Sequence, residues 1–316
     1  MYHKYTRLSF LIFFLTSFVS CITNPYAVTN RSYKKQVKAL ARTIKNTPVQ
    51  PPGADSLSMG DYWVGTTNFN LRKPNFVIIH HTAQDSTAQT LKTFTRPQTQ
   101  VSAHYVIGRD GKIYHMLNDY LRAWHGGAAK WGNTTDINST SIGIELDNNG
   151  LEPFAEAQIN SLLLVLARLK KTYNIPTANF IGHSDIAPTR KNDPSPIFPW
   201  KKLAEKGYGF WYDEAILENL LIDSLTADST INLPNLPQSG MQPLITSTLT
   251  SDSLALTNGV PLNFNPKEAL RIIGYDTSNL DAAIRAFKHH FIQTDINAVL
   301  TRRDLLVLYN LYQKYF

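Results

Sequence analysis

The amino-acid sequence predicts an α/β fold, in which a mixed central β-sheet is flanked by helices and followed by a small three-helix C-terminal domain. Three observations predict this class. Short apolar, β-branched runs alternate with helical patterns between residues 62 and 211. The dipeptide Asp110-Gly111 stands between two short strand patterns. Amphipathic helical spacing returns from residue 266 to the end of the chain.

The first elements of the predicted sheet come from residues 75–117. Residues 75–82, NFVIIHHT, are a β-branched apolar run and predict a buried strand. A short helix follows, with Asp85 or Ser86 as its N-cap. Residues 102–117 predict two strands joined at the Asp-Gly turn, which favours a hairpin.

The remaining elements of the larger domain alternate in the same way. Residues 140–147, TSIGIELD, predict another strand. Residues 152–175 predict a helix, because its leucines and isoleucine recur on one face. Residues 178–186, ANFIGHSDI, predict a strand that leads into the proline-rich loop 182–200, whose composition suits neither a helix interior nor a central strand.

The length of 316 residues indicates one large and one smaller domain, and 43% hydrophobic residues supply enough apolar material for a sizeable core. The expected organisation is a signal peptide at 1–20, a lipid-anchor tether at 21–61 and the larger α/β domain at 62–222. A linker or insertion at 223–262, rich in Ser, Thr, Leu, Asn and Pro, precedes the helical domain at 263–316.

The N-terminus has the features of an export signal. Lys4 and Arg7 precede an apolar run over residues 8–19, which is shorter than the ~20 residues that a membrane-spanning helix needs. Cys21 follows and is the single cysteine of the chain, so no intramolecular disulfide can form. The segment FVSC resembles a bacterial lipobox, which implies lipidation of Cys21; the alternative is an ordinary signal peptide with an incidental cysteine. Either reading predicts an exported protein.

The charge of the chain is basic. The formal net charge is +7, and two of the cations lie in residues 1–20, which leaves +5 after their removal. Such a charge suits polyanions such as cell-wall glycans or anionic headgroups. Nucleic acid is disfavoured, because no basic and aromatic residues interleave as a platform. Residues 22–60 are polar, carry a basic cluster at 31–38 and predict a tether with a short helix.

Histidines gather in the larger domain, where six of the nine lie between His80 and His183. Without cysteine partners, this cluster indicates a catalytic metal site, which keeps three protein ligands and one open position. No His-Glu-x-x-His helix is present. Spacing alone does not choose among the candidate ligands, which are His80 or His81, His104, His115, His125, His183, Asp185 and Asp193. In a strand, His80 and His81 point to opposite faces.

The tail carries a second pair of adjacent histidines, His289 and His290. They stand on an amphipathic helical pattern beside Phe287 and Phe291. We therefore expect them to be ordinary surface or boundary residues rather than metal ligands.

Five motifs in order resemble one known family. FVIIHHTA, SAHYVIGRDGKIYHML, RAWHGG, TSIGIELDNNG and GHSDIAPTRKNDPSPIFPW follow one another with the approximate spacing of the zinc-dependent N-acetylmuramoyl-L-alanine amidases of the type-2 amidase family. The resemblance is greatest to the outer-membrane lipoprotein members, and it covers residues 62–211. It implies an amidase fold of the predicted class.

The resemblance implies a site for one zinc ion per chain. By motif position the metal ligands are His80, His183 and Asp193, the catalytic glutamate is Glu145 and the transition-state lysine is Lys191. The chemistry agrees with these roles. Zinc lowers the pKa of its bound water, which is the expected nucleophile. Glu145 can act as general base and acid, and Lys191 can stabilise the oxyanion.

The resemblance also suggests residues that line the substrate groove and a role for the C-terminal segment. Trp124 and His125 match the segment AWH and are expected to line the substrate groove, whereas His104 and His115 flank the hairpin and are expected to be structural. The tail segment GYDTSNLDAAIRAFKHHF resembles the three-helix peptidoglycan-binding modules that accompany such amidases. It is expected either to bind glycan or to pack against the catalytic domain.

The resulting expectation is an exported amidase, an outer-membrane lipoprotein that faces the periplasm and acts as a monomer. It would cleave the amide between N-acetylmuramic acid and L-alanine in peptidoglycan or muropeptides. The alternative from another class is a non-catalytic peptidoglycan recognition protein, which the complete ligand set disfavours. A zinc peptidase that cuts within the stem peptide is disfavoured by the motifs.

Overall fold

The computed structural model describes residues 24–45, 66–217, 256–257 and 259–316. The chain divides into two compact units, with the boundary between Asn70 and Leu71. The predicted signal peptide, Cys21 and most of the predicted linker lie outside the described residues. Among the helices of the described residues, none combines the length and the apolar character that crossing a membrane requires.

The first unit contributes helix α2 (Ala27–Lys45), which is longer than the short helix expected in the tether. No residue of α2 is buried. Its C-terminal turn carries the cations Arg42 and Lys45, whose charges favour that end of the helix dipole.

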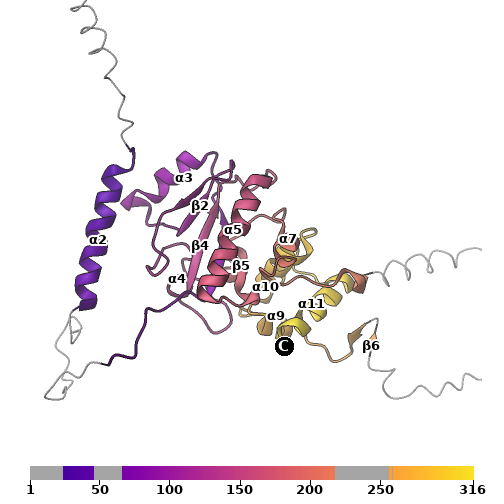
Figure 1. Cartoon of the computed structure of the whole chain (residues 1–316). Helices are drawn as coiled ribbons and strands as arrows, with labels where there is room; N and C mark the ends of the chain where they lie inside the picture. The colour runs from indigo at the N-terminus through magenta and orange to yellow at the C-terminus, as the bar shows by residue number, and fades with distance from the viewer. Residues whose placement is uncertain (1–23, 46–65, 218–255, 258) are drawn as a thin grey trace, which may run out of the picture. The chain divides into compact units, whose positions relative to one another are not determined.

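The second unit is built on a five-stranded mixed sheet with the strand order β3-β2-β4-β1-β5 (Figure 1). Strand β3 is antiparallel to β2, and the other neighbouring strands are parallel. The strands are β1 (Phe76–His81), β2 (Tyr105–Ile107), β3 (Ile113–His115), β4 (Ser141–Leu146) and β5 (Phe180–Gly182). The predicted mixed sheet and its hairpin are confirmed.

Helices lie between the strands as the alternating pattern predicts. They are α3 (Thr87–Phe94), α4 (Ile137–Thr140), α5 (Glu156–Tyr173), α6 (His183–Ile186) and α7 (Trp200–Ala204), with short 3₁₀ turns η1 (Pro97–Thr99), η2 (Thr177–Asn179) and η3 (Glu214–Leu217). Ser86 is the N-cap of α3, because its side chain accepts a hydrogen bond from the Gln89 backbone N–H. The strand predicted over 178–186 ends at Gly182, and the chain turns into α6 at His183.

The C-terminal region is helical, as expected. It contains the two-stranded hairpin β6 (Leu256–Thr257) and β7 (Val260–Pro261), followed by α9 (Pro266–Ile273), α10 (Leu280–Phe287), the π-helical turn η4 (Lys288–Ile292) and α11 (Arg302–Tyr315). The N-caps are typical: Asn265 and Asn279 each accept backbone N–H bonds, and Thr301 forms a capping box with Asp304.

The two faces of the sheet are covered differently. One face carries Val77, Ile79 and Ile144, which pack with the apolar stripe of α5. The opposite face carries Phe76 and Ile78, which share a core with α9, α10 and α11. Because side chains alternate along a strand, His80 follows Phe76 and Ile78 onto this second face. The C-terminal helices and the polar end of β1 therefore lie on the same side of the sheet.

Candidate active site

The sheet register brings His80 and Glu145 together. Strands β1 and β4 are parallel neighbours, and His80 and Glu145 are Cα partners near their carboxyl ends. His183 comes directly after β5, the other neighbour of β1. Three adjacent parallel strands thus end at one place, which is where ligands bind in open α/β sheets.

Three side-chain atoms from this region form a small triangle. The Nδ1 atoms of His80 and His183 are 2.9 Å apart, and each lies 3.0–3.1 Å from Oδ2 of Asp193. All three side chains are buried. The predicted ligand triad is therefore assembled in space, although its members are 10 to 113 residues apart in the sequence.

A backbone hydrogen bond closes the proline-rich loop between two of the ligands. The Ser184 N–H donates to the carbonyl of Asp193 over 2.8 Å, so the residues that follow His183 and the end of the loop are held side by side. The loop therefore turns back on itself and presents both His183 and Asp193 to one point.

The hydrogen bond at Nε2 of His183 fixes its proton there, so the unprotonated Nδ1 faces the triangle. Nε2 of His183 lies 3.2 Å from the carbonyl oxygen of Gly126, which can only accept a hydrogen bond. His183 therefore carries its proton on Nε2 when neutral, and its Nδ1 lone pair faces the other ligands. Arg190 also donates to the Gly126 carbonyl, over 2.7 Å, and to that of Ala128, so its guanidinium fixes this loop.

His80 is oriented by a chain of buried hydrogen bonds. The Ser141 hydroxyl donates to the Ile137 carbonyl over 2.6 Å, so Ser141 Oγ accepts from Nε2 of His125 at 3.1 Å. Nδ1 of His125 is then an acceptor for Nε2 of His80, also at 3.1 Å. The chain assigns the His80 proton to Nε2 and leaves its Nδ1 lone pair toward Asp193.

Gly143 provides the space that His125 occupies. A Cβ atom built on Gly143 would lie 2.4 Å from Cγ of His125. Cβ atoms in proteins do not approach other side-chain atoms so closely. The Gly143 N–H donates to Nδ1 of His104, whose Nε2 lies 2.9 Å from the Leu121 carbonyl. His104 is thus a structural residue, as predicted. The glycine in the strand permits a second layer of histidines behind His80.

The triangle consists of three converging acceptors. Two imidazole lone pairs and a carboxylate oxygen repel one another unless a cation lies between them. Tetrahedral zinc with bonds of about 2.0–2.1 Å needs ligand atoms about 3.3 Å apart, close to the separations found here. Two histidines and one carboxylate, with the second ring nitrogens bonded to neighbours, fit a zinc ion.

The ionisation of the ligands agrees with a metal site. Burial and the neighbouring His183 lower the pKa of His80 to about 4, so this imidazole is neutral at pH 7. Burial raises the pKa of Asp193, but the close contacts with the imidazoles of His183 and His80 outweigh that effect and hold it well below its usual value. Metal ligands must be neutral imidazoles and ionised carboxylates, and both conditions are met.

Glu145 lies beside the triangle without a fixed partner. Its Oε1 is 4.0 Å from Nδ1 of His80, and among the described residues its buried Oε2 has no hydrogen-bond partner. Burial, followed by the charge of Asp193, raises the pKa of Glu145 to about 8, whereas the charge of Lys191 acts in the opposite direction. A carboxyl group that exchanges its proton near neutral pH is suited to acid–base catalysis. Lys191 itself is exposed.

The C-terminal helices hold the turn that carries His183. Asp185 is fully buried and accepts three hydrogen bonds, from the Gly182 N–H at 2.7 Å, the Tyr275 hydroxyl at 2.8 Å and Nδ1 of His290 at 2.8 Å. Burial and the Asp185 charge raise the pKa of Tyr275 well above its usual value, so its hydroxyl keeps the proton that it donates. Asp185 is therefore a supporting residue and not a member of the ligand triangle.

The expectation for His289 and His290 is wrong, because both are buried. His289 donates from Nε2 to the carbonyl of Pro194, next to the ligand Asp193, over 2.8 Å. His290 bonds to Asp185 and stacks on Trp200 with ring centroids 3.8 Å apart. The physical reason is the π-helical turn η4, whose five residues are all buried. This turn brings both histidines against the proline-rich loop 182–200, the ligand loop, so simple amphipathic spacing does not apply. The adjacent histidines were the one sequence feature that could have indicated this contact.

The other predicted residues occupy distinct places. His81 accepts a hydrogen bond from the Ser195 N–H at its Nδ1, on the side opposite to His80. His115 is paired with Asp119 in the hairpin. Trp124 is 48% exposed, whereas His125 is buried behind His80. The structure thus separates Trp124 and His125, which the sequence had placed together in a groove.

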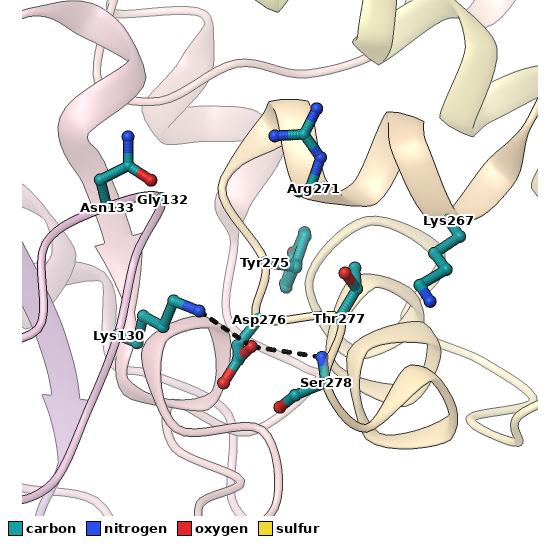
Figure 2. A pocket seen from close by; sticks show the side chains of 9 residues that line it. All are labelled: Lys130, Gly132, Asn133, Lys267, Arg271, Tyr275, Asp276, Thr277 and Ser278. Carbon is teal, nitrogen blue, oxygen red and sulfur yellow. Dashed lines mark hydrogen bonds and ion pairs between the residues drawn. The ribbon is translucent and has the colours of Figure 1, made fainter.

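A separate pocket of about 340 Å³ lies between the loop at residues 130–133 and α9 (Figure 2). Its lining includes Lys130, Lys267 and Arg271, together with the segment 275–278. Lys130 donates to Asp276, which also accepts from the Ser278 N–H, each over 3.2 Å. The pocket contains no member of the ligand triangle, so the chemistry described above is not located there.

Comparison with known proteins agrees with this geometry. Residues 70–196 match the model of the family Amidase_2, N-acetylmuramoyl-L-alanine amidase. Among curated proteins, the chain is 39% identical over 153 residues to the N-acetylmuramoyl-L-alanine amidase AmiD of Escherichia coli, a match that covers 43% of this chain and 54% of that protein. The chain thus spans about half the length of this relative.

Two solved structures resemble most of the chain. The complex of E. coli AmiD with the substrate anhydro-N-acetylmuramic acid-L-Ala-D-γ-Glu-L-Lys is 27% identical with a TM-score of 0.59, and the match covers 79% of this chain and 93% of that one. The structure of AmpDh3 from Pseudomonas aeruginosa is 28% identical with a TM-score of 0.58, and the match covers 82% and 99%. Both matches extend well beyond the length of the family model.

Proposed function

We propose that this chain, whose residues 70–196 match the model of the N-acetylmuramoyl-L-alanine amidase family, hydrolyses the amide between N-acetylmuramic acid and L-alanine in peptidoglycan or muropeptides. The observation that carries the proposal is the buried triangle of His80, His183 and Asp193 beside the unpartnered carboxyl of Glu145. The muropeptide substrates in solved structures of similar proteins support the same substrate class.

His80, His183 and Asp193 would hold one zinc ion, and the second ring nitrogens of the histidines already have partners that fix their lone pairs inward. Zinc in such a site polarises an amide carbonyl and lowers the pKa of water. Glu145 then accepts the proton of the attacking water and delivers it to the leaving nitrogen. Lys191 offsets the negative charge that develops on the carbonyl oxygen. Exposed Trp124 would contact the sugar or the stem peptide.

A complete ligand set supports hydrolysis over simple recognition. A receptor needs shape and polar contacts but has no need for three buried acceptors that repel one another without a cation. Nor does it need a buried carboxyl with a pKa of about 8 at the same point. We therefore favour the enzyme over the non-catalytic recognition protein.

The test is incubation of the purified chain with muropeptides, with zinc or with a chelator, followed by mass spectrometry of the products. We expect zinc-dependent release of an intact stem peptide that begins at L-alanine. Glu145→Gln is the matched control, because it preserves the ligand triangle and removes the acid–base group. Binding of muropeptide without any turnover in the zinc-loaded chain would favour the recognition protein, and cuts inside the peptide would favour a peptidase.

The proposal also includes the cellular location. The apolar run before Cys21 and the lipobox-like FVSC support export and lipidation of Cys21, and hence an outer-membrane lipoprotein facing the periplasm. Metabolic labelling with a fatty acid and fractionation of membranes test this, and Cys21→Ser should abolish the fatty-acid label. Light scattering of the purified chain tests the expected monomer.

For the C-terminal helices, the contacts of Tyr275, His289 and His290 support a role in holding the ligand loop. Glycan binding by this region is a second role, which its resemblance to peptidoglycan-binding modules suggests. If the C-terminal region binds glycan, the Glu145→Gln chain, which lacks the acid–base group, should sediment with sacculi. Loss of that sedimentation in a variant of the exposed pocket residues Lys267 and Arg271 would locate the glycan contact.

A further inference from the structure

Helix α2 places four large apolar residues on the side opposite its cations, whereas Val28 at its start lies next to the basic side. Tyr33, Val37, Leu40 and Ile44 follow one another at intervals of four, three and four residues, which places them within an arc of about 60° on a helix of 3.6 residues per turn. The opposite arc of about 100° carries all the cations of the helix, namely Arg31, Lys34, Lys35, Lys38, Arg42 and Lys45. The helix contains no acidic residue.

No residue on the apolar side of α2 is buried in the described part of the chain, although Tyr33 and Val37 are half-buried. Leu40 is 51% exposed and Ile44 is 73% exposed, and no residue of the helix is buried. An apolar stripe of this length on an otherwise charged helix indicates a partner surface. The six cations indicate that this surface is anionic.

We propose that α2 lies flat on an anionic lipid surface, with Tyr33, Val37, Leu40 and Ile44 in the acyl boundary and the cations among the headgroups. A lipid surface is favoured over a wall glycan or a nucleic acid, because neither of those offers an apolar layer for the stripe. The helix lies on the membrane and does not cross it, since its mean hydropathy is low and its polar side is fully charged.

Because α2 lies between Cys21 and the amidase unit, its contact with the membrane limits how far that unit can reach. Five residues separate Cys21 from Ala27, so a lipidated Cys21 would keep the start of the helix within about 20 Å of the membrane. With α2 held on the surface, residues 46–70 connect it to the amidase unit, which can therefore reach no more than about 90 Å from the helix. The helix therefore restricts the enzyme to the wall nearest the membrane.

The experiment uses the processed chain, residues 21–316, as the Cys21→Ser form, so that no lipid anchor contributes. Its binding is measured by co-sedimentation with vesicles of phosphatidylcholine alone or with about one third phosphatidylglycerol. We expect binding to the anionic vesicles that weakens as salt is added. A Leu40→Trp variant should show a blue-shifted tryptophan emission on the anionic vesicles, because the stripe enters an apolar layer.

Two variants of α2 and one matched control separate its contributions. Lys34→Gln/Lys35→Gln/Lys38→Gln should weaken vesicle binding by roughly a hundredfold, since each cation near an anionic surface contributes about fivefold. A second variant, Val37→Ser/Leu40→Ser, keeps every charge and should also weaken binding. The control removes the same charge from exposed lysines of the amidase unit, and it should bind like the parent: Lys171→Gln/Lys202→Gln/Lys206→Gln.

Three outcomes would overturn the proposal. The first is equal loss in the control and the α2 charge variant, which would mean non-specific attraction. The second is full binding by the serine variant or no emission shift, which would mean that the stripe stays in water. The third is absence of binding to the anionic vesicles; weaker sedimentation of the α2 charge variant than of the parent with sacculi would then assign α2 to the wall. Hydrolysis of soluble muropeptides should be unchanged in all α2 variants, so a failure of the proposed amidase activity is detected separately.

Discussion

Replacement of Glu145 by glutamine should change how the stability of the metal-free protein depends on pH. The buried carboxyl of Glu145 has a pKa of about 8 in the folded protein, against an ordinary value of 4.5. Between these two values the folded state binds more protons at this site than the unfolded state does. The free energy of unfolding must therefore fall as pH rises through this range. Glutamine has no proton to lose, so Glu145→Gln removes this dependence.

The magnitude follows from the two pKa values. Each pH unit between them lowers the free energy of unfolding by about 1.4 kcal/mol. From about pH 5.5 to about pH 7.5, the parent should lose about 2–3 kcal/mol relative to Glu145→Gln. The histidines titrate in both proteins alike, so the difference between the two isolates Glu145.

The assay is urea denaturation of both proteins in the presence of a chelator, at several pH values in this range. A difference in unfolding free energy that stays constant with pH would refute the inference that Glu145 is protonated in the folded, metal-free site. Repeating the series with zinc is a second check. A nearby cation favours the ionised carboxylate, so metal should reduce the pH dependence.

The remaining predictions concern the groups that hold the site. Asp193→Ala should abolish zinc retention in equilibrium dialysis, whereas Glu145→Gln should retain zinc and lose turnover; zinc retention in both would remove Asp193 from the ligand set. His125→Ala should weaken zinc binding about 10- to 100-fold in a chelator competition, because it frees the second ring nitrogen of His80; unchanged affinity would contradict the hydrogen-bond chain. Gly143→Ala should lower the unfolding free energy by about 1–3 kcal/mol, measured by urea denaturation, since its Cβ would overlap His125; a neutral result would mean that the ring moves freely. Tyr275→Phe should cost about 1.5–3 kcal/mol and also weaken zinc binding, because Asp185 loses a donor; lower stability with unchanged zinc affinity would limit the contact to a structural role.

Much of the catalytic half was predictable because its elements are local. The β-branched run at 75–82, the Asp110-Gly111 turn and the leucine stripe of α5 each specify an element through neighbouring residues alone. The motif set then selected His80, His183 and Asp193, and the structure assembles these three buried side chains around one point. Spacing by itself had left eight candidates open, since distances along a chain do not define distances in space.

The contacts that hold the ligand residues in place were not predictable in the same way. Ser141 and Gly143 carry no sequence feature that relates them to His125, because their contact depends on the packing of a loop on a strand. His289 and His290 had a visible pattern, but helical periodicity placed them at the surface. Their burial follows from a π-helical turn that packs against the ligand loop more than ninety residues earlier.

The amino-acid sequence alone determined the strands and helices of the larger domain and the amphipathic character of α2. Those properties depend on residue type and on spacing within a few turns or strands. The candidate metal ligands were selected by the resemblance of the motifs to a known family. Only the tertiary structure decided that the C-terminal helices hold the turn at Asp185, and that a chain of hydrogen bonds through His125 orients His80. Such contacts join buried polar groups from distant segments, and each group must find its partner wherever the packed core leaves it.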